Sequence, residues 1–156
     1  MNKKDLYHRC LAHFSEQAKA LEAAARKTAA MATDEEHKAR SKYETFSLEN
    51  SYLARGQAQR VEDMRATLST LRAMKVIELP ESAEVQLGAL VEVTDQTGAT
   101  EFLWVVPTGG GKEIEQDDHT ILLLTPSSPL AQALMKKREG DTIDFAGRAL
   151  RIQSVH

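Results

Sequence analysis

Three consecutive carboxylates, Asp34, Glu35 and Glu36, have the residue types and spacing best suited to hold a divalent cation in this 156-residue chain. Adjacent carboxylates repel one another, and a shared cation relieves that repulsion. The alternative is that they occupy the first turn of a helix, where the helix dipole favours negative side chains. The residues alone leave both interpretations open.

Other patterns point less directly to chemistry. Thr108-Gly-Gly-Gly-Lys112 lacks the spacing of a phosphate-binding loop and precedes a strand-like run, so we interpret it as a hairpin turn. Glu115-Gln-Asp-Asp118 could attract a cation weakly, although a solvated loop is the preferred interpretation. Cys10 and His13 have no second pair to complete a zinc site. We therefore find no self-contained enzyme active site in these patterns.

The first half of the chain must position the acidic residues. Its apolar residues recur at alternating steps of four and three, which predicts two helices that pack as an antiparallel coiled coil. The two series are Tyr7, Leu11, Phe14, Ala18, Leu21, Ala25, Thr28 and Ala32, and then Ala54, Gln57, Val61, Met64, Leu68 and Leu71.

Matching the two series places the turn of this hairpin near residues 38–40. Ser41 and Glu44 form a possible capping box for the second helix, but Thr33 and Glu36 have the same spacing, so a helix could also restart at Asp34. An arm of about 30 residues would reach ~45 Å, which exceeds what packing on a small domain requires.

The second half changes to a strand-like period, and three regions follow: a helical hairpin at 1–77, a linker at 78–84 and a domain at 85–156. Ser128 and Pro129 predict the capped start of a short helix. This pattern predicts an α+β fold, with a long antiparallel helical hairpin followed by a small antiparallel sheet and one short helix. The predicted strands are Val85–Val93, Glu101–Val106, Thr120–Thr125, Thr142–Phe145 and Ala149–Val155, and the predicted helix is Leu130–Lys137.

The segment Ser128-Pro-Leu-Ala-Gln-Ala-Leu134, followed by Gly140-Asp141 and a terminal hairpin, resembles the C-terminal signature of the bacterial Gre transcript-cleavage factors. The hairpin-first order and the chain length match the same family. The resemblance implies an FKBP-like C-terminal domain that docks on RNA polymerase, with the hairpin inserted into the polymerase secondary channel. In that setting Ser128, Pro129 and Leu130 would form the docking helix.

The resemblance also implies what the hairpin tip would do. Acidic residues of the family help to hold a weakly bound Mg²⁺ in the polymerase active site, which promotes hydrolysis of backtracked RNA by two metal ions. Asp34, Glu35 and Glu36 would then hold an Mg²⁺ shared with the polymerase, and no cofactor is expected to bind stably. The resemblance thus implies a factor that assists the polymerase's own nuclease activity and is not itself an enzyme. The nearby basic residues, Lys38, Arg40 and Lys42, could contact nascent RNA or nucleotide phosphate, or could simply be solvated. The family also implies DNA binding within the transcription complex.

The acidic motif of the family, Gly-Asp-Leu-x-Glu-Asn-Ala-Glu-Tyr, is altered here. Leu48-Glu-Asn-Ser-Tyr52 echoes part of it, but Phe46 stands where an aspartate is expected. One alternative is therefore a factor that occupies the channel without cleavage and competes with other channel-binding proteins. A second is an interaction protein like the nucleoside-diphosphate-kinase regulators, which have a shorter hairpin. We expect a monomer, with self-association through the Tyr7–Leu21 seam as a further alternative.

The distribution of charge and the amino-acid composition indicate the kind of partner and the cellular compartment. Residues 1–77 hold 14 Lys and Arg against 10 Asp and Glu, and residues 78–156 hold 6 against 13, so a basic half precedes an acidic half. Such asymmetry favours a charged macromolecular partner. Since no apolar run is long enough to span a membrane and the single Cys10 fits a reducing compartment, we expect a cytoplasmic protein.

Overall fold

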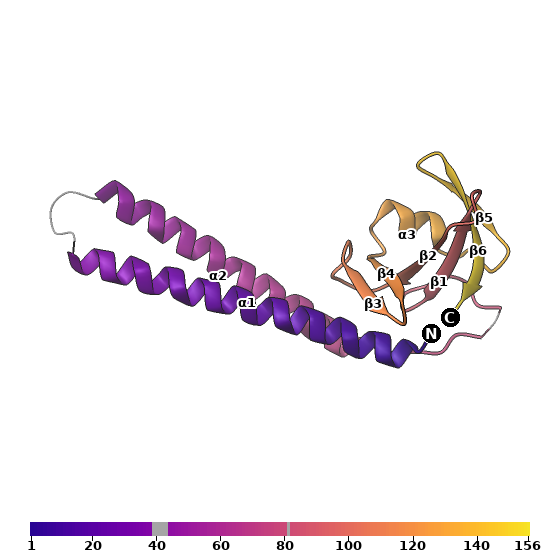
Figure 1. Ribbon diagram of the computed structural model, residues 1–156, viewed down its shortest axis with the longest axis horizontal. Helices are drawn as coiled ribbons and strands as arrows, with labels where there is room; N and C mark the ends of the chain where they lie inside the picture. Colours follow the sequence, from indigo (N-terminus) through magenta and orange to yellow (C-terminus); the bar gives the residue numbers. More distant parts are fainter. Residues whose placement is uncertain (39–43, 81) are drawn as a thin grey trace. The chain divides into compact units, whose positions relative to one another are not determined.

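The computed structural model describes the main chain of residues 1–38, 44–80 and 82–156, and the side chains of residues 1–31, 52–80 and 82–156. The chain divides into two compact units (Figure 1). One unit comprises residues 12–69, within two long helices. The other comprises residues 1–11 and 70–156, and it contains the sheet.

The first two helices are α1 (Lys3–Lys38) and α2 (Glu44–Ala73). Lys38 is therefore helical, and the rest of the turn predicted near residues 38–40 lies outside the described residues. In the hairpin unit, Phe14 and Ala18 of α1 and Val61 and Leu68 of α2 are buried. The remaining heptad positions whose side chains are described are buried or half-buried, which confirms the predicted seam. Arg65 of α2 bridges to Glu22 of α1 at 2.9 Å.

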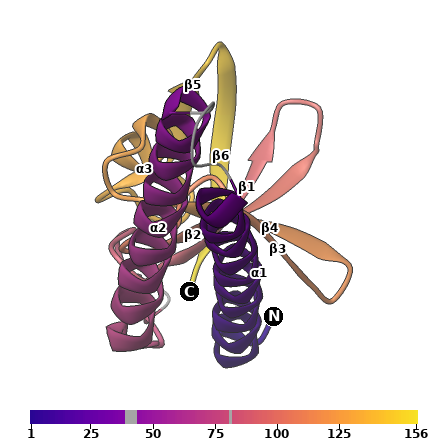
Figure 2. The same cartoon turned by 90° about the vertical axis from the view of Figure 1, so that its left-hand side faces the viewer.

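The sheet has six strands in the order β3-β4-β2-β1-β6-β5. Figure 2 shows the turns of the β1–β2 and β3–β4 hairpins as separate projections. Neighbouring strands are antiparallel except β2 and β4, which are parallel. The strands are β1 (Leu90–Asp95), β2 (Thr100–Val105), β3 (Glu113–Gln116), β4 (His119–Leu124), β5 (Thr142–Phe145) and β6 (Arg148–Val155).

One face of the sheet packs against the short helix α3 (Pro129–Leu134). Because strand side chains alternate between faces, Leu103 and Val105 join the core beneath α3, whereas Trp104 points to the opposite face. Trp104 is fully buried there, and its indole nitrogen donates to the main-chain oxygen of Gly88 at 3.3 Å. Both faces of the sheet therefore bury apolar side chains.

The fold class is as predicted, an α+β chain with a helical hairpin before the sheet, but three details of the prediction were wrong. The sheet is not wholly antiparallel, because residues 106–118 carry the chain across and let β4 lie beside β2 in the same direction. The segment interpreted as a solvated acidic loop instead contains the end of β3 and its turn, with Gln116 buried. The glycine-rich turn 108–112 joins β2 to β3, which are not neighbours.

Element bounds also differ from the prediction. The first strand begins at Leu90, five residues later than expected, although Val85 is buried and its N–H donates to the oxygen of Lys137 at 2.7 Å. Helix α3 ends at Leu134, because Met135 is extended and Lys136 has a φ of 65°. An L-residue in the left-handed region ends a helix at this point.

Candidate functional site

The segment predicted to dock on a partner forms a capped helix. The Ser128 hydroxyl accepts a hydrogen bond from the N–H of Ala131 at 3.3 Å, and Pro129 occupies the first turn. Both residues therefore have the capping roles that their types predict. Leu130 is only 8% exposed and packs into the core, so it anchors α3 and offers little surface to a partner.

The loop before α3 is held by several short contacts. The N–H of Ser128 donates to the oxygen of Thr125 at 2.9 Å, and the Gln132 side chain donates to the oxygen of Ser127 at 3.3 Å. A side chain at Gly110 would approach the main-chain nitrogen of Thr125 to 3.0 Å, so glycine permits this close approach.

The exposed surface of this segment differs from the predicted one. We call it the α3 surface. It keeps Pro129 from the prediction and adds three residues that the prediction did not include, because they lie beside the motif or between its apolar positions. Its exposed residues are Pro126, Ser127, Pro129 and Gln132. The helical spacing of the apolar residues Leu130, Ala131 and Leu134 was the sequence signal that could have identified the exposed positions between them.

The predicted tip residues lie mostly beyond what the structure describes. Residues 34–36 and Lys38 belong to the last turns of α1, a single continuous helix, so no helix restarts at residue 34. Their side chains, like Arg40, Lys42 and the proposed capping residue Ser41, lie outside the described residues. Among the described residues, no cluster of three or more His, Cys, Asp or Glu is arranged to hold a metal ion.

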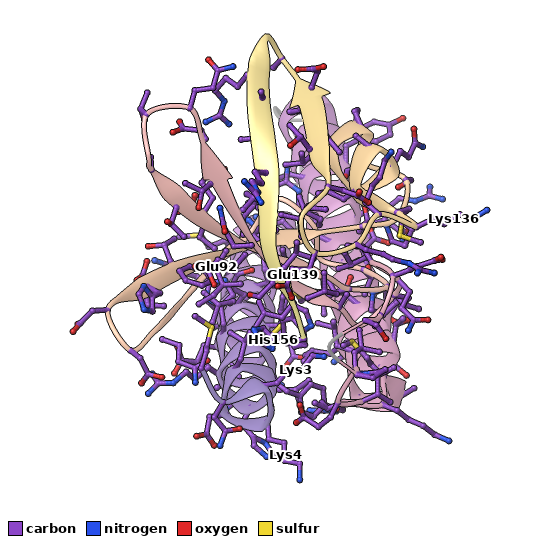
Figure 3. All side chains as sticks on the ribbon, turned by 90° about the vertical axis from the view of Figure 1, so that its right-hand side faces the viewer. Lys3, Lys4, Glu92, Lys136, Glu139 and His156 are labelled. Atoms are coloured by element: carbon purple, nitrogen blue, oxygen red, sulfur yellow. The ribbon has the colours of Figure 1, made fainter. Side chains whose placement is uncertain are left out.

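A buried lysine, Lys3, connects three parts of the sheet unit through hydrogen bonds. Lys3 is 3% exposed, and its ammonium donates to the main-chain oxygens of Ile77, at 2.7 Å, and His156, at 2.6 Å. Figure 3 shows Lys3 beside His156 at one end of the sheet. Burial lowers the pKa of Lys3, and the nearby carboxylate of Glu78 acts in the opposite direction. Lys3 thus joins the start of α1 to the segment after α2 and to the end of β6.

Cys10 lies on the same end of α1 and is a candidate for redox chemistry only if its thiolate can form. The side chain is 1% exposed, and burial raises the pKa of its thiol to about 11. A thiol with such a pKa is almost wholly protonated at neutral pH and is a poor nucleophile. Cys10 is therefore a packing residue.

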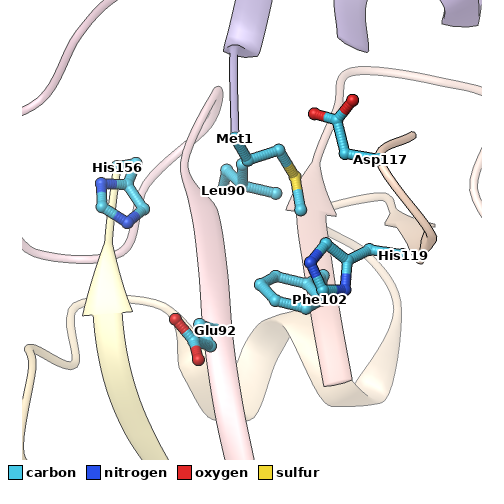
Figure 4. Close-up of a pocket in the computed structure, with 7 residues that line it drawn as sticks. All are labelled: Met1, Leu90, Glu92, Phe102, Asp117, His119 and His156. Atoms are coloured by element: carbon cyan, nitrogen blue, oxygen red, sulfur yellow. The ribbon is translucent and has the colours of Figure 1, made fainter. Parts of the chain in front are cut away.

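A cavity of about 250 Å³ opens in the sheet unit (Figure 4). It lies against β1, β2 and the β3–β4 turn and mixes carboxylates with aromatic and apolar groups. The rings of Phe102 and His119 are in contact, with centroids 4.6 Å apart. The lining residues are Met1, Leu90, Glu92, Phe102, Asp117, His119 and His156.

Comparisons with known proteins were made for the whole chain. No protein-family model matches it, and no curated protein matches it. None of the described helices combines the length and apolar character needed to cross a membrane.

Among the solved structures similar to this chain are factors of the Gre type. The crystal structure of GreA factor homolog 1 (Gfh1) of Thermus thermophilus is 18% identical, with 94% of each chain covered and a TM-score of 0.38. Gfh1 of Thermus aquaticus is 17% identical, with 93% of this chain and 92% of that chain covered and a TM-score of 0.37. The elongation factor GreA/GreB from Nitrosomonas europaea is 19% identical, with 63% of this chain and 90% of that chain covered and a TM-score of 0.36.

Proposed function

We propose that this protein is a Gre-type transcription elongation factor that binds RNA polymerase and assists cleavage of backtracked RNA. The observation that carries the proposal is the Ser128–Leu134 motif, which resembles the Gre signature and forms a short helix with an exposed, hydrogen-bonded loop before it. A pre-ordered surface loses little conformational entropy when it docks, and this favours a role in partner binding.

On this proposal the α3 surface docks on the polymerase and the helical hairpin enters the secondary channel. Helix α1 has 36 residues and α2 has 30, so they extend roughly 54 Å and 45 Å at 1.5 Å per residue. That length supports a role beyond packing on the sheet unit. Asp34, Glu35 and Glu36 would assist the polymerase by holding its second Mg²⁺, and Lys38, Arg40 and Lys42 would contact RNA.

A cleavage assay on stalled elongation complexes tests this assignment. We expect the wild-type chain to accelerate shortening of backtracked RNA in the presence of Mg²⁺, and the triple variant Asp34→Ala, Glu35→Ala, Glu36→Ala to lose at least about tenfold of that acceleration. The matched control removes three exposed acids from elsewhere in the hairpin, Glu16, Glu62 and Asp63. Equal cleavage by the two triple variants would contradict the role of the tip.

A second candidate function is a channel-binding modulator that does not cleave, which Phe46 favours because it replaces an acid of the family motif. The same complexes distinguish the two. A modulator would leave the RNA intact and would slow cleavage by an added cleavage factor in proportion to its own concentration. Cleavage by the wild-type chain alone would exclude it.

A further inference from the structure

The cavity of the sheet unit lies on the sheet face opposite α3. Val91 and Val93 of β1 belong to the core under α3, so Glu92 between them points to the other face. Glu92 is opposite Phe102 in the β1–β2 register, and paired residues share a face. His119 packs against Phe102 from β4. Three strands therefore bring a carboxylate and two rings together.

Two carboxylates line this cavity. Glu92 is half-buried and accepts one hydrogen bond, from the Ser154 hydroxyl at 3.1 Å, which leaves further acceptor positions on its carboxylate. Asp117 supplies a second carboxylate from the β3–β4 turn. Within the described part of the chain, no lysine or arginine lines the cavity. The ammonium of Lys3 donates instead to main-chain oxygens.

A buried acceptor without a partner lies on the same face. Gln116 is opposite His119 in the β3–β4 register and is 2% exposed. Its side-chain nitrogen donates to the oxygen of Asn2 at 3.1 Å, whereas its side-chain oxygen has no hydrogen-bond partner among the described residues. A buried acceptor left unpaired is unfavourable, and a donor that reached it would remove this cost.

We propose that this cavity binds a guanidinium cation. A guanidinium is planar, donates from several N–H groups in a fixed fork and stacks on aromatic rings, so it can pair with the carboxylate of Glu92 while it contacts Phe102. An ammonium is a compact charge without a stacking face, and a neutral urea group lacks the charge. The proposed site is separate from the α3 surface and does not depend on the function proposed above.

Titration of the full-length chain, followed by two-dimensional amide NMR, tests the site. We expect ethylguanidinium to shift the amides of residues 92, 102, 117 and 119 in a saturable way, with a Kd in the millimolar range expected for so small a ligand. Ethylammonium should bind at least about fivefold more weakly, and ethylurea should not bind. Equal binding of the three probes, or no saturable shift, would overturn the proposal.

Variants keep the test specific to the cavity. Glu92→Gln removes the charge from β1 and should weaken ethylguanidinium binding at least about fivefold. Asp117→Asn removes a charge from the exposed β3–β4 turn and should weaken binding less. Glu113→Gln, an exposed acid of β3 that does not line the cavity, is the matched control and should bind as wild type. Unchanged affinity of both cavity variants would refute the site, whatever the probe.

Two sources could present this cation, a free small molecule or an arginine side chain of a partner protein. A blocked Gly-Arg-Gly peptide and free ethylguanidinium distinguish them in the same titration. Tighter binding of the peptide would support a protein source, and tighter binding of the free cation would support a small molecule. Failure of both ligands would overturn the site without bearing on polymerase binding.

Discussion

Replacement of Cys10 by alanine should remove a specific loss of stability at alkaline pH. Burial raises the pKa of the thiol from 9.0 to about 11 in the folded chain. Because the folded state holds this proton more tightly, the thiol contributes stability that is complete below pH 9 and is lost as the pH rises through 11. Between pH 7.5 and pH 10 this linkage lowers the free energy of unfolding by about 1.4 kcal/mol.

Urea unfolding of wild type and Cys10→Ala at the two pH values measures this quantity. The cavity left by the smaller side chain lowers the variant's stability equally at both pH values, so the difference between the two pH responses isolates the thiol. The lowered pKa of Lys3 has the opposite sign in the alkaline range, but it is present in both proteins and cancels. Wild type should lose about 1.4 kcal/mol more than the variant between the two pH values. Equal losses, or a larger loss in the variant, would refute the assignment of the thiol to a buried, neutral state.

Other substitutions test the packing described above. Gly56→Ala in α2 meets no atom within 4 Å and should raise the free energy of unfolding by about 0.5–1 kcal/mol, measured by urea titration; a decrease would contradict the helical assignment. Ser128→Ala removes the cap of α3 and should lower that free energy by about 1 kcal/mol, whereas Ser128→Asp should retain most of it. Lys3→Met leaves the oxygens of Ile77 and His156 without their donor, so it should lower Tm and reduce the free energy of unfolding by about 2–4 kcal/mol. An unchanged Tm would mean that these two hydrogen bonds of Lys3 do not stabilise the fold.

The hairpin and α3 could be predicted from the sequence because each has a strong local signal. Two heptad series without proline define α1 and α2, and the pair Ser128 and Pro129 marks the start of α3. These signals depend only on residues close together in the sequence, so they can be recognised without knowledge of the tertiary fold. The end of α3 was harder to predict, because Lys136 adopts a left-handed conformation that is uncommon for lysine.

The strands were less predictable because their signals are short. Strand β3 has only Glu-Ile-Glu-Gln, and its burial depends on neighbours distant in sequence. Val85 and Ala89 are buried like strand residues, yet they lie before β1. The cavity could not be predicted at all, because β1, β2 and the β3–β4 turn contribute its residues and no motif links them. The α3 surface could not be predicted either, because the motif does not tell which of its residues are exposed. Only the structure distinguishes exposed Pro129 and Gln132 from buried Leu130.

The most direct test of the account is a binding measurement between the fluorescently labelled full-length chain and purified core RNA polymerase. We predict a saturable complex with a Kd of the order of micromolar or tighter. The double variant Ser127→Glu, Gln132→Glu adds charge to the α3 surface and removes the Gln132 hydrogen bond to the Ser127 oxygen, while the core residues stay unchanged; it should weaken the complex at least about tenfold. The control variant Thr97→Glu, in the exposed β1–β2 turn, should bind as wild type. No complex at about 10 μM polymerase, or equal affinity of all three proteins, would contradict the proposal that this chain docks on RNA polymerase through the α3 surface.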